Sequence, residues 1–527
     1  MFERFTNTQE TEDAAGRIRQ LLDAHHEWFL SAGHGDARAT ALTKDEFDIS
    51  VAQGRLIFSY WGDAGALLWR IAGWEWTGEK LLLEATRNFG REAAVLELVP
   101  RASAKASAAV ISATRRARCE RLAKLGAMQI AGAQIEKARL SAGVRRDEPG
   151  RYARIVLNTR RERLAVTGIV TESGAGDADA FLSTALLWFL RVRERSGGAS
   201  RLRTEKLWLA CGRECLAAVR QRVALLREDL RRTISLYEIH DDWQRLAPVP
   251  QLTAEELWLP QRAFVRRSLS GEQFGEFAEE VRALMPEAFD VVRGRRGETL
   301  RYHGLAFARV RRLMSREHVW FGTEKARRRL LDDTTREEWF KLLGDLREHR
   351  RANAGDHRHA LYRAAPEAWL ESLLRRDITR LDPGLIVAPL HAQFRATPTN
   401  DERANGIDLH HNAARPVDLL ALRRDGRLVV IELKVSEDRE IVFQGVDYWR
   451  RVSAYHRAGH IERARLFGDA EISDEPPLVY LVAPLLRYHR AFDTLARAIS
   501  PEIEMYRFDI NEDWRTGVRV TRRTRVS

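Results

Sequence analysis

Three charged residues stand at the two ends of an otherwise apolar hairpin sequence, DLLALRRDGRLVVIELK, which runs from Asp418 to Lys434. Asp425 and Gly426 form a strong turn signal, so the two apolar runs are predicted to be antiparallel strands. Glu432 and Lys434 are two residues apart and therefore project from the same face of the second strand. The hairpin can bring Asp418 beside them. Charges among apolar neighbours are costly unless they are paired or used, so we expect a site here.

The residue types point to metal-assisted hydrolysis. Asp418 and Glu432 can hold a hard divalent cation, Mg²⁺ or Mn²⁺, because carboxylate oxygens are the ligands that such ions prefer. Lys434 is a compact point charge that can orient an attacking water or help to deprotonate it. A metal-bound water facing a phosphodiester defines a hydrolytic site. The alternative is a surface Glu–Lys ion pair, but the apolar flanks favour a central strand.

The hairpin and the segment after it resemble the PD-(D/E)XK nuclease superfamily. The letters PVD and ELK end at Asp418 and Lys434, with thirteen residues between Asp418 and Glu432. The following sequence QGVDY places Gln444 and Tyr448 as in the Gln-x-x-x-Tyr helix of the RecB-type branch. The hairpin sequence is especially similar to that of the NucS-like endonucleases. The resemblance implies that Asp418 and Glu432 bind the metal and that Lys434 orients the water.

Further site residues follow from the same resemblance, which extends from about Pro366 to Asp509. Gln444 and Tyr448 would lie on one helix face, against the substrate backbone or the active-site lysine. Glu371, in the helix before the hairpin, stands where many members have an additional acid on the metal side. Glu367 lies one turn earlier and is the alternative for that role.

The chain as a whole is predicted to be an α/β protein of several domains, because 527 residues exceed a single core. The resemblance implies a restriction-endonuclease-like αβββαβ domain at residues 361–527. Short strand patterns predict a β-rich N-terminal domain at residues 1–101. We expect a basic helical linker at 102–150, an α/β domain at 151–245, and a mixed, mainly helical region at 246–360.

The block at 151–245 is a candidate inactive copy of the C-terminal domain. Both blocks are predicted to contain a hairpin, a helix, a strand, a helix and a strand in that order. Sliding one block by 264 positions places RIVLNTRRERLAVTGIV over the opening hairpin without a gap. Asp418, Glu432 and Lys434 then fall on Arg154, Gly168 and Val170, in that order. The copy would therefore have lost its chemistry, although the few identities in an Arg-rich chain can also arise by chance.

Composition bears on partners and compartment. The net charge is +12, which favours a polyanionic partner, and we expect DNA rather than RNA. The chain has nine lysines and 78 arginines, a bias that a GC-rich genome can also produce. Three cysteines exclude a disulfide scaffold and favour a reducing cytoplasm. We expect no signal peptide, no membrane span and no ATP-binding loop.

These features predict a cytoplasmic, Mg²⁺-dependent DNA nuclease, an endonuclease of DNA repair or defence, whose catalytic domain is C-terminal. The other domains are expected to bind DNA or a protein partner, and the protein is also compatible with a homodimer. The alternative function is a nucleic-acid-binding or assembly protein whose nuclease fold no longer cuts. The intact Asp418, Glu432 and Lys434 favour the active enzyme.

Overall fold

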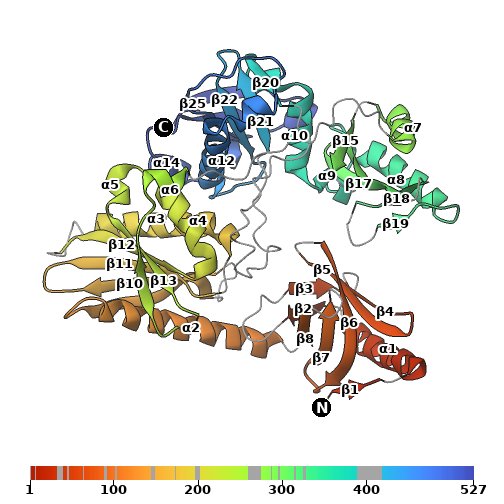
Figure 1. Cartoon of the computed structure of the whole chain (residues 1–527), viewed down its shortest axis with the longest axis horizontal. Coiled ribbons are helices and arrows are strands. Elements are labelled where there is room, and N and C mark those ends of the chain that lie inside the picture. The colour runs from red at the N-terminus through yellow and green to blue at the C-terminus, as the bar shows by residue number, and fades with distance from the viewer. Residues whose placement is uncertain are drawn as a thin grey trace.

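The chain is an α/β protein with several sheets, shown in Figure 1. The computed structural model describes residues 2–526, except for 6, 26, 33–39, 44–46, 63–64, 88–91, 101–103, 144–148, 172–173, 196–201, 242, 259–274, 287, 295–296, 314–315, 324–327 and 389–417. None of the helices in these described ranges is long and apolar enough to cross a membrane.

The N-terminal hundred residues are β-rich, as predicted, and their described part forms an eight-stranded sheet. The strands are β1 (Glu3–Arg4), β2 (Glu27–Ala32), β3 (Thr40–Thr43), β4 (Phe47–Ala52), β5 (Arg55–Gly62), β6 (Gly65–Trp76), β7 (Leu81–Arg87) and β8 (Glu92–Pro100). A helix that the strand patterns did not indicate, α1 (Thr8–Asp23), precedes most of them. Asn7 caps α1, and Ile18 is fully buried in the core of this domain.

The segment at 102–150 is not a helical linker. Its helix α2 (Ala104–Met128) ends in the middle of the segment, and a strand, β9 (Gln134–Ala142), follows it and pairs with the next strand. Gly132 has φ of +71°, which a residue with a side chain seldom adopts, so the chain can turn there. Because α2 packs on β9 and β10, both elements belong to the middle domain.

The middle domain is a six-stranded sheet with order β14-β13-β12-β11-β10-β9. Its further strands are β10 (Pro149–Asn158), β11 (Arg163–Ile169), β12 (Thr204–Cys211), β13 (Ile234–Ile239) and β14 (Leu246–Val249). Its further helices are α3 (Ala178–Arg195), α4 (Arg213–Val223) and the short α5 (Glu228–Arg231). The predicted hairpin, both main helices and both later strands are present.

Residues 246–360 are not mainly helical, because their described part contains a five-stranded antiparallel sheet. The strands are β15 (Phe289–Gly294), β16 (Gly297–Tyr302), β17 (Leu305–Leu313), β18 (Arg316–Phe321) and β19 (Arg329–Leu330). The helices are α6 (Ala254–Leu257), α7 (Glu276–Leu284), α8 (Arg336–His349) and α9 (Ala360–Arg363). Arg309 and Arg311 alternate with the buried Ala308 and Val310 along β17, a strand pattern that the arginine bias concealed.

The C-terminal domain has a six-stranded sheet with order β20-β21-β22-β23-β24-β25. The strands are β20 (Leu385–Val387), β21 (Leu419–Arg423), β22 (Leu428–Leu433), β23 (Leu478–Pro484), β24 (Met505–Ile510) and β25 (Val520–Arg525). The helices are α10 (Pro366–Arg376), α12 (Ile441–Arg457), α13 (His460–Arg463) and α14 (Phe492–Ala496). The first two residues of the PVD motif, 416 and 417, lie outside the described residues.

The middle and C-terminal sheets share one connectivity. Each begins with a helix and three antiparallel strands, followed by a helix, a parallel strand, a helix, a second parallel strand and an antiparallel edge strand. In this scheme β10, β11 and α3 correspond to β21, β22 and α12. The order of elements that the hairpin alignment predicts is therefore present in both domains.

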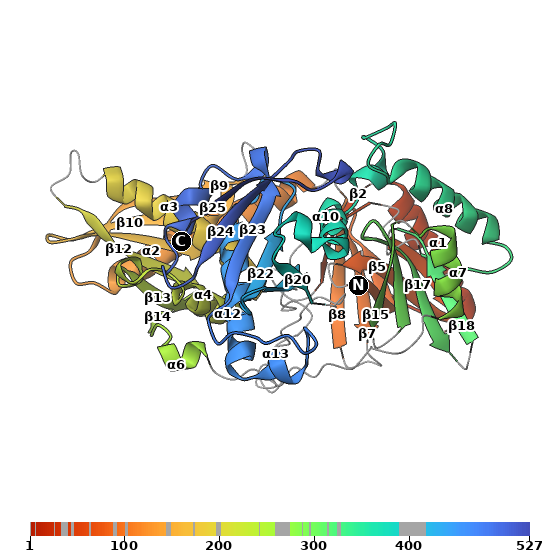
Figure 2. The same ribbon diagram turned by 90° about the horizontal axis from the view of Figure 1, so that it is seen from above.

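The two domains pack through their corresponding helices (Figures 1 and 2). Helix α4 contacts α12, α14 contacts α3, and α3 contacts α12. One continuous apolar core contains residues of both domains, including Phe181 and Leu216 with Phe443 and Ile499. The reciprocal helix contacts have the pattern of a two-fold dimer formed within one chain.

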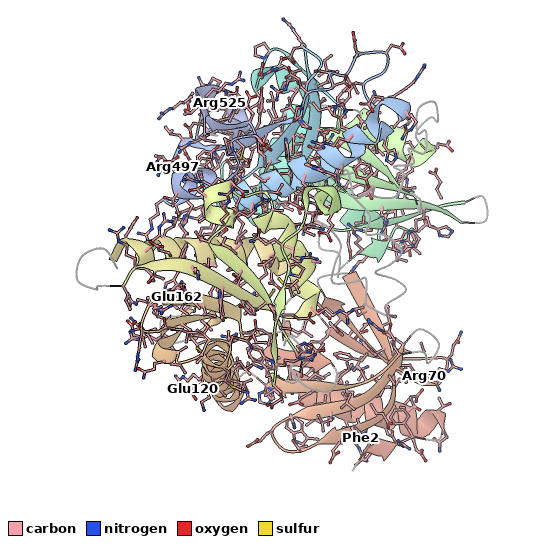
Figure 3. The ribbon with its side chains drawn as sticks, turned by 60° about the vertical axis from the view of Figure 1, so that its left-hand side comes forward. Phe2, Arg70, Glu120, Glu162, Arg497 and Arg525 are labelled. Atoms are coloured by element: carbon pink, nitrogen blue, oxygen red, sulfur yellow. The ribbon has the colours of Figure 1, made fainter. Side chains whose placement is uncertain are left out.

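The backbone also crosses this boundary. Leu226, after α4, forms an antiparallel bridge with Ile499, after α14. The N–H of Arg227 donates to the carbonyl of Ala498 at 3.0 Å, and the N–H of Ser500 donates to that of Leu225 at 2.9 Å. Figure 3 labels Arg497 where the blue C-terminal domain meets the yellow middle domain.

Candidate active site

The hairpin that carries the site is built as its sequence predicts. Leu419 pairs with Ile431 and Leu422 with Leu428, so the chain turns through residues 423–427. Gly426 has φ of +81°, and a Cβ there would meet the backbone of Ser473 at 3.0 Å, so glycine is required for both reasons. The two strands are therefore held in one register, which places Asp418 opposite Glu432.

Asp418, Glu432 and Lys434 converge as predicted. Lys434 Nζ lies 2.7 Å from Glu432 Oε1, and Asp418 Oδ2 accepts the N–H of Leu433 at 2.8 Å. The Glu432 residue is only 1% exposed. Within the described residues, its second oxygen, Oε2, is buried and has no hydrogen-bond partner. The strand is central rather than exposed, so the surface ion-pair interpretation does not apply.

Burial sets the ionisation of this group. It raises the pKa of Asp418 to about 6, against the opposing effects of the Leu433 N–H and Lys434. It also raises the pKa of Glu432 well above the usual range, and the neighbouring Asp418 adds to this. Burial alone would lower the pKa of Lys434, but Glu432 and Asp418 raise it overall. Two acids with a single lysine in a dry place would be stabilised by an added cation.

Helix α12 supplies the predicted glutamine and tyrosine. Gln444 and Tyr448 are 2% and 4% exposed. The side chain of Gln444 is directed to Glu440 at 3.5 Å, while its Oε1 is buried with no partner among the described residues. Burial raises the pKa of the Tyr448 phenol, and the charges of Glu432 and Asp418 raise it further. Tyr448 is therefore a neutral phenol on the helix whose Gly445 faces Glu432.

Helix α10 brings the additional acids near the site. Glu371 is largely buried and accepts a hydrogen bond from Arg375 Nε at 2.7 Å. Arg375 also donates to the backbone carbonyl of Asp418 at 3.1 Å, so it joins α10 to the first strand of the hairpin. The charges of Glu371 and the more exposed Glu367 both raise the pKa of Asp418.

Two nearby groups were not predicted. Asp438 Oδ2 lies 3.7 Å from Lys434 Nζ, four residues further along the chain. Arg375 lies four residues after Glu371 on α10, and this spacing in the sequence could have predicted their ion pair.

The donor set suits a divalent cation. Asp418 and Glu432 provide carboxylate oxygens on adjacent strands, and one of these oxygens is buried without a partner. Mg²⁺ needs only one or two carboxylates because water and substrate phosphate complete its coordination. As the side chains stand, no group of three or more His, Cys, Asp or Glu in the described part of the chain is arranged around one ion.

The corresponding place in the middle sheet differs by one residue from the ungapped alignment. The turn at residues 159–162 is one residue shorter than that at 423–427, and Arg154 pairs with Thr167. A Cβ on Gly168 would point at Leu122 of α2, whereas Glu432 faces Gly445 of α12. Thr167 therefore corresponds to Glu432.

The same shift applies to Lys434, whose counterpart is Ile169 rather than Val170. Arg154 keeps the place of Asp418, as aligned. Its Nε is buried, and no acceptor among the described residues bonds to it. Burial and the charges of Arg191 and Arg439 lower the pKa of Arg154. Arg154, Thr167 and Ile169 offer no carboxylate, so these three positions cannot hold a cation.

Comparisons of this chain with protein-family models, with curated proteins and with solved structures find no match.

Proposed function

We propose that this protein is a metal-dependent nuclease that hydrolyses phosphodiester bonds in DNA at the site between β21, β22 and α12. One observation carries the proposal: Glu432 is buried beside Asp418 and Lys434, with one carboxylate oxygen lacking a partner among the described residues. A buried carboxylate oxygen without a partner is costly, and it is retained where a cation or substrate satisfies it.

In this proposal Asp418 and Glu432 hold Mg²⁺ or Mn²⁺. The ion, when bound, would lower the pKa of a water and offset phosphate charge. Lys434 donates hydrogen bonds from its ammonium, and so orients the water for in-line attack. Gln444 and Tyr448 bind the substrate backbone or steady Lys434, and Glu371 supplies a further carboxylate. The net charge of +12 favours association with DNA at low salt.

The topology supports the same proposal. The α10-β20-β21-β22-α12-β23 succession is the αβββαβ order that the resemblance to PD-(D/E)XK nucleases implies. The place of the acids, at the end of the hairpin and under the next helix, agrees with that resemblance.

The direct test is incubation of the full chain with labelled single-stranded, duplex and branched DNA, in Mg²⁺, Mn²⁺ or EDTA. We expect cleavage with either metal, and none in EDTA or for Lys434→Ala. DNA retention by the same variant in a filter assay would separate catalysis from binding. Metal-independent cleavage, or binding of DNA without cleavage by the wild-type protein, would contradict the proposal. The second result would favour the non-cutting alternative.

A further inference from the structure

A buried charge cluster crosses the boundary between the middle and C-terminal domains. It consists of five side chains, none more than 8% exposed: Asp179 of α3, Arg222 of α4, and Asp447, Arg450 and Arg451 of α12. Buried ions are costly unless their partners are well placed, and here two acids lie among three arginines.

Arg222 is the residue that joins the two domains. Its Nε lies 2.9 Å from Asp179 Oδ1 in its own domain, and its Nη1 lies 3.0 Å from Asp447 Oδ1 in the other. Burial would raise the pKa of Asp447, but the guanidinium groups of Arg222, Arg451 and Arg450 hold it below its usual range. The cluster is therefore ionised, and Arg222 links the two domains through its ion pairs with Asp179 and Asp447.

The cluster continues to the candidate active site. Arg451 forms an ion pair with Asp447, and its guanidinium carbon lies 5.6 Å from the centre of the Tyr448 ring. Tyr448 lies on α12, which packs on the strand of Glu432: a Cβ on Gly445 of this helix would lie 3.9 Å from the Cβ of Glu432. The charges of Glu432 and Asp418 also raise the pKa of the Tyr448 phenol. A chain of contacts thus leads from Arg222 through Asp447 and Arg451 to Tyr448.

We propose that Arg222 is a positioning residue for the candidate active site: through Asp447 and Arg451 it fixes Tyr448 and this turn of α12. The middle domain, which lacks the acids, then supports the active-site geometry of the C-terminal domain, which has them. This inference rests on the proposed function, since it names what the middle domain does for that site.

The test uses Arg222→Met in the full chain, which keeps much of the side-chain length and removes the charge. We expect kcat on DNA to fall by about tenfold to 100-fold because of misplacement within α12, while KM and DNA affinity change little. Amide hydrogen exchange at residues 444–448 should become faster. Arg222→Lys should restore part of kcat, and it also provides a milder variant if Arg222→Met does not fold.

Asp179→Asn is the matched control. It removes a charge from the same cluster but leaves the link between Arg222 and Asp447. We expect wild-type kcat within about twofold and unchanged exchange at residues 444–448, even if the thermal midpoint falls. An unchanged kcat in folded Arg222→Met, or an equal loss in Asp179→Asn, would overturn the positioning role.

A second variant tests whether Arg222 acts through Asp447. Asp447→Asn should lower kcat, and adding Arg222→Met to it should cause little further loss, because one pathway is then already broken. Fully additive losses would overturn the pathway. If the wild-type protein does not cleave DNA, the proposed function fails, and hydrogen exchange decides the positioning role alone. Faster exchange in Arg222→Met but not in Asp179→Asn then supports it, and equal exchange overturns it.

Discussion

The middle and C-terminal sheets have the same strand order and directions, but only one of them has acids at the end of its hairpin. Asp418 and Glu432 face each other in the C-terminal sheet, whereas Arg154 and Thr167 do so in the middle sheet. Lys434 has Ile169 as its counterpart. The difference shows that this connectivity does not require the buried charges, since the middle sheet forms without them. Their presence in one domain is therefore better explained by function than by folding.

The interface adds a second contrast. Both domains present the same pair of helices to each other, yet the charge cluster lies mostly on α12, with three of its five members. The middle domain contributes Arg222 and Asp179 to it. The C-terminal domain thus contains the candidate metal-binding acids, and the middle domain contributes two of the five residues of the charge cluster.

The largest effect is expected from removing the acids that distinguish the two sheets. Asp418→Asn and Glu432→Gln should each lower cleavage by about three orders of magnitude, roughly 4 kcal/mol of transition-state stabilisation, since the cation would be lost. DNA binding and folding should remain. Cleavage rates and filter binding measure this, and Thr167→Val is the control at the matching position, with no expected loss. Full Mg²⁺-dependent activity of either acid variant would show that these are not the catalytic residues.

Lys434→Arg is expected to be almost as damaging as Lys434→Ala. The guanidinium is planar and wider than an ammonium, so it cannot take the same place beside Glu432. Initial cleavage rates of the two variants give the comparison. The control is Lys206→Arg in the middle sheet, where Lys206 forms an exposed ion pair with Glu162 at 2.7 Å and should tolerate the exchange. Near wild-type turnover by Lys434→Arg would make Lys434 a structural ion-pair partner only.

A product analysis tests whether the pair of domains has one cutting site. Of the two corresponding hairpins, only the C-terminal one places two acids and a lysine together, so each encounter should cut one strand. Supercoiled plasmid should convert first to nicked circles, and linear DNA should appear later from independent second cuts. Gel analysis over time measures both products. Linear DNA formed at the same rate as nicked circles would indicate a second site or cooperation between two molecules.

The smallest effect is expected at the counterpart of Asp418. Arg154 lies near Arg191 and Arg439, and its Nε has no acceptor within the described ranges, so a DNA phosphate would be a suitable partner. Arg154→Ala should weaken DNA binding a few-fold and lower the salt slope by about one, with kcat unchanged. Titrations at several salt concentrations measure this. Arg232→Ala, in an exposed pair with Glu228, is the control, and equal slopes for both variants would exclude a phosphate role.

Sequence patterns predicted the elements whose periodicity is strong. The 418–434 hairpin and the closeness of Glu432 to Lys434 follow from alternation and from the Asp-Gly turn, and helix α12 follows from the Gln-x-x-x-Tyr motif. The strands of residues 289–330 do not follow from the sequence because the arginine bias conceals their alternation, and β9 lies where a helix is predicted. The one-residue shift between the hairpins depends on turn length, which the ungapped alignment could not display. The contact of Arg222 with Asp447 joins distant segments, so local patterns contain no signal for it.

The Leu226–Ile499 bridge lies where two separate subunits would meet if the domains were not joined in one chain. Separate subunits associate according to their concentration, and a dilute pair comes apart. Within one chain the partner is always present, because the two domains are covalently joined. The two domains therefore stay associated at any concentration of the protein. Each domain can also change its sequence independently, because its partner is the other domain and not a copy of itself.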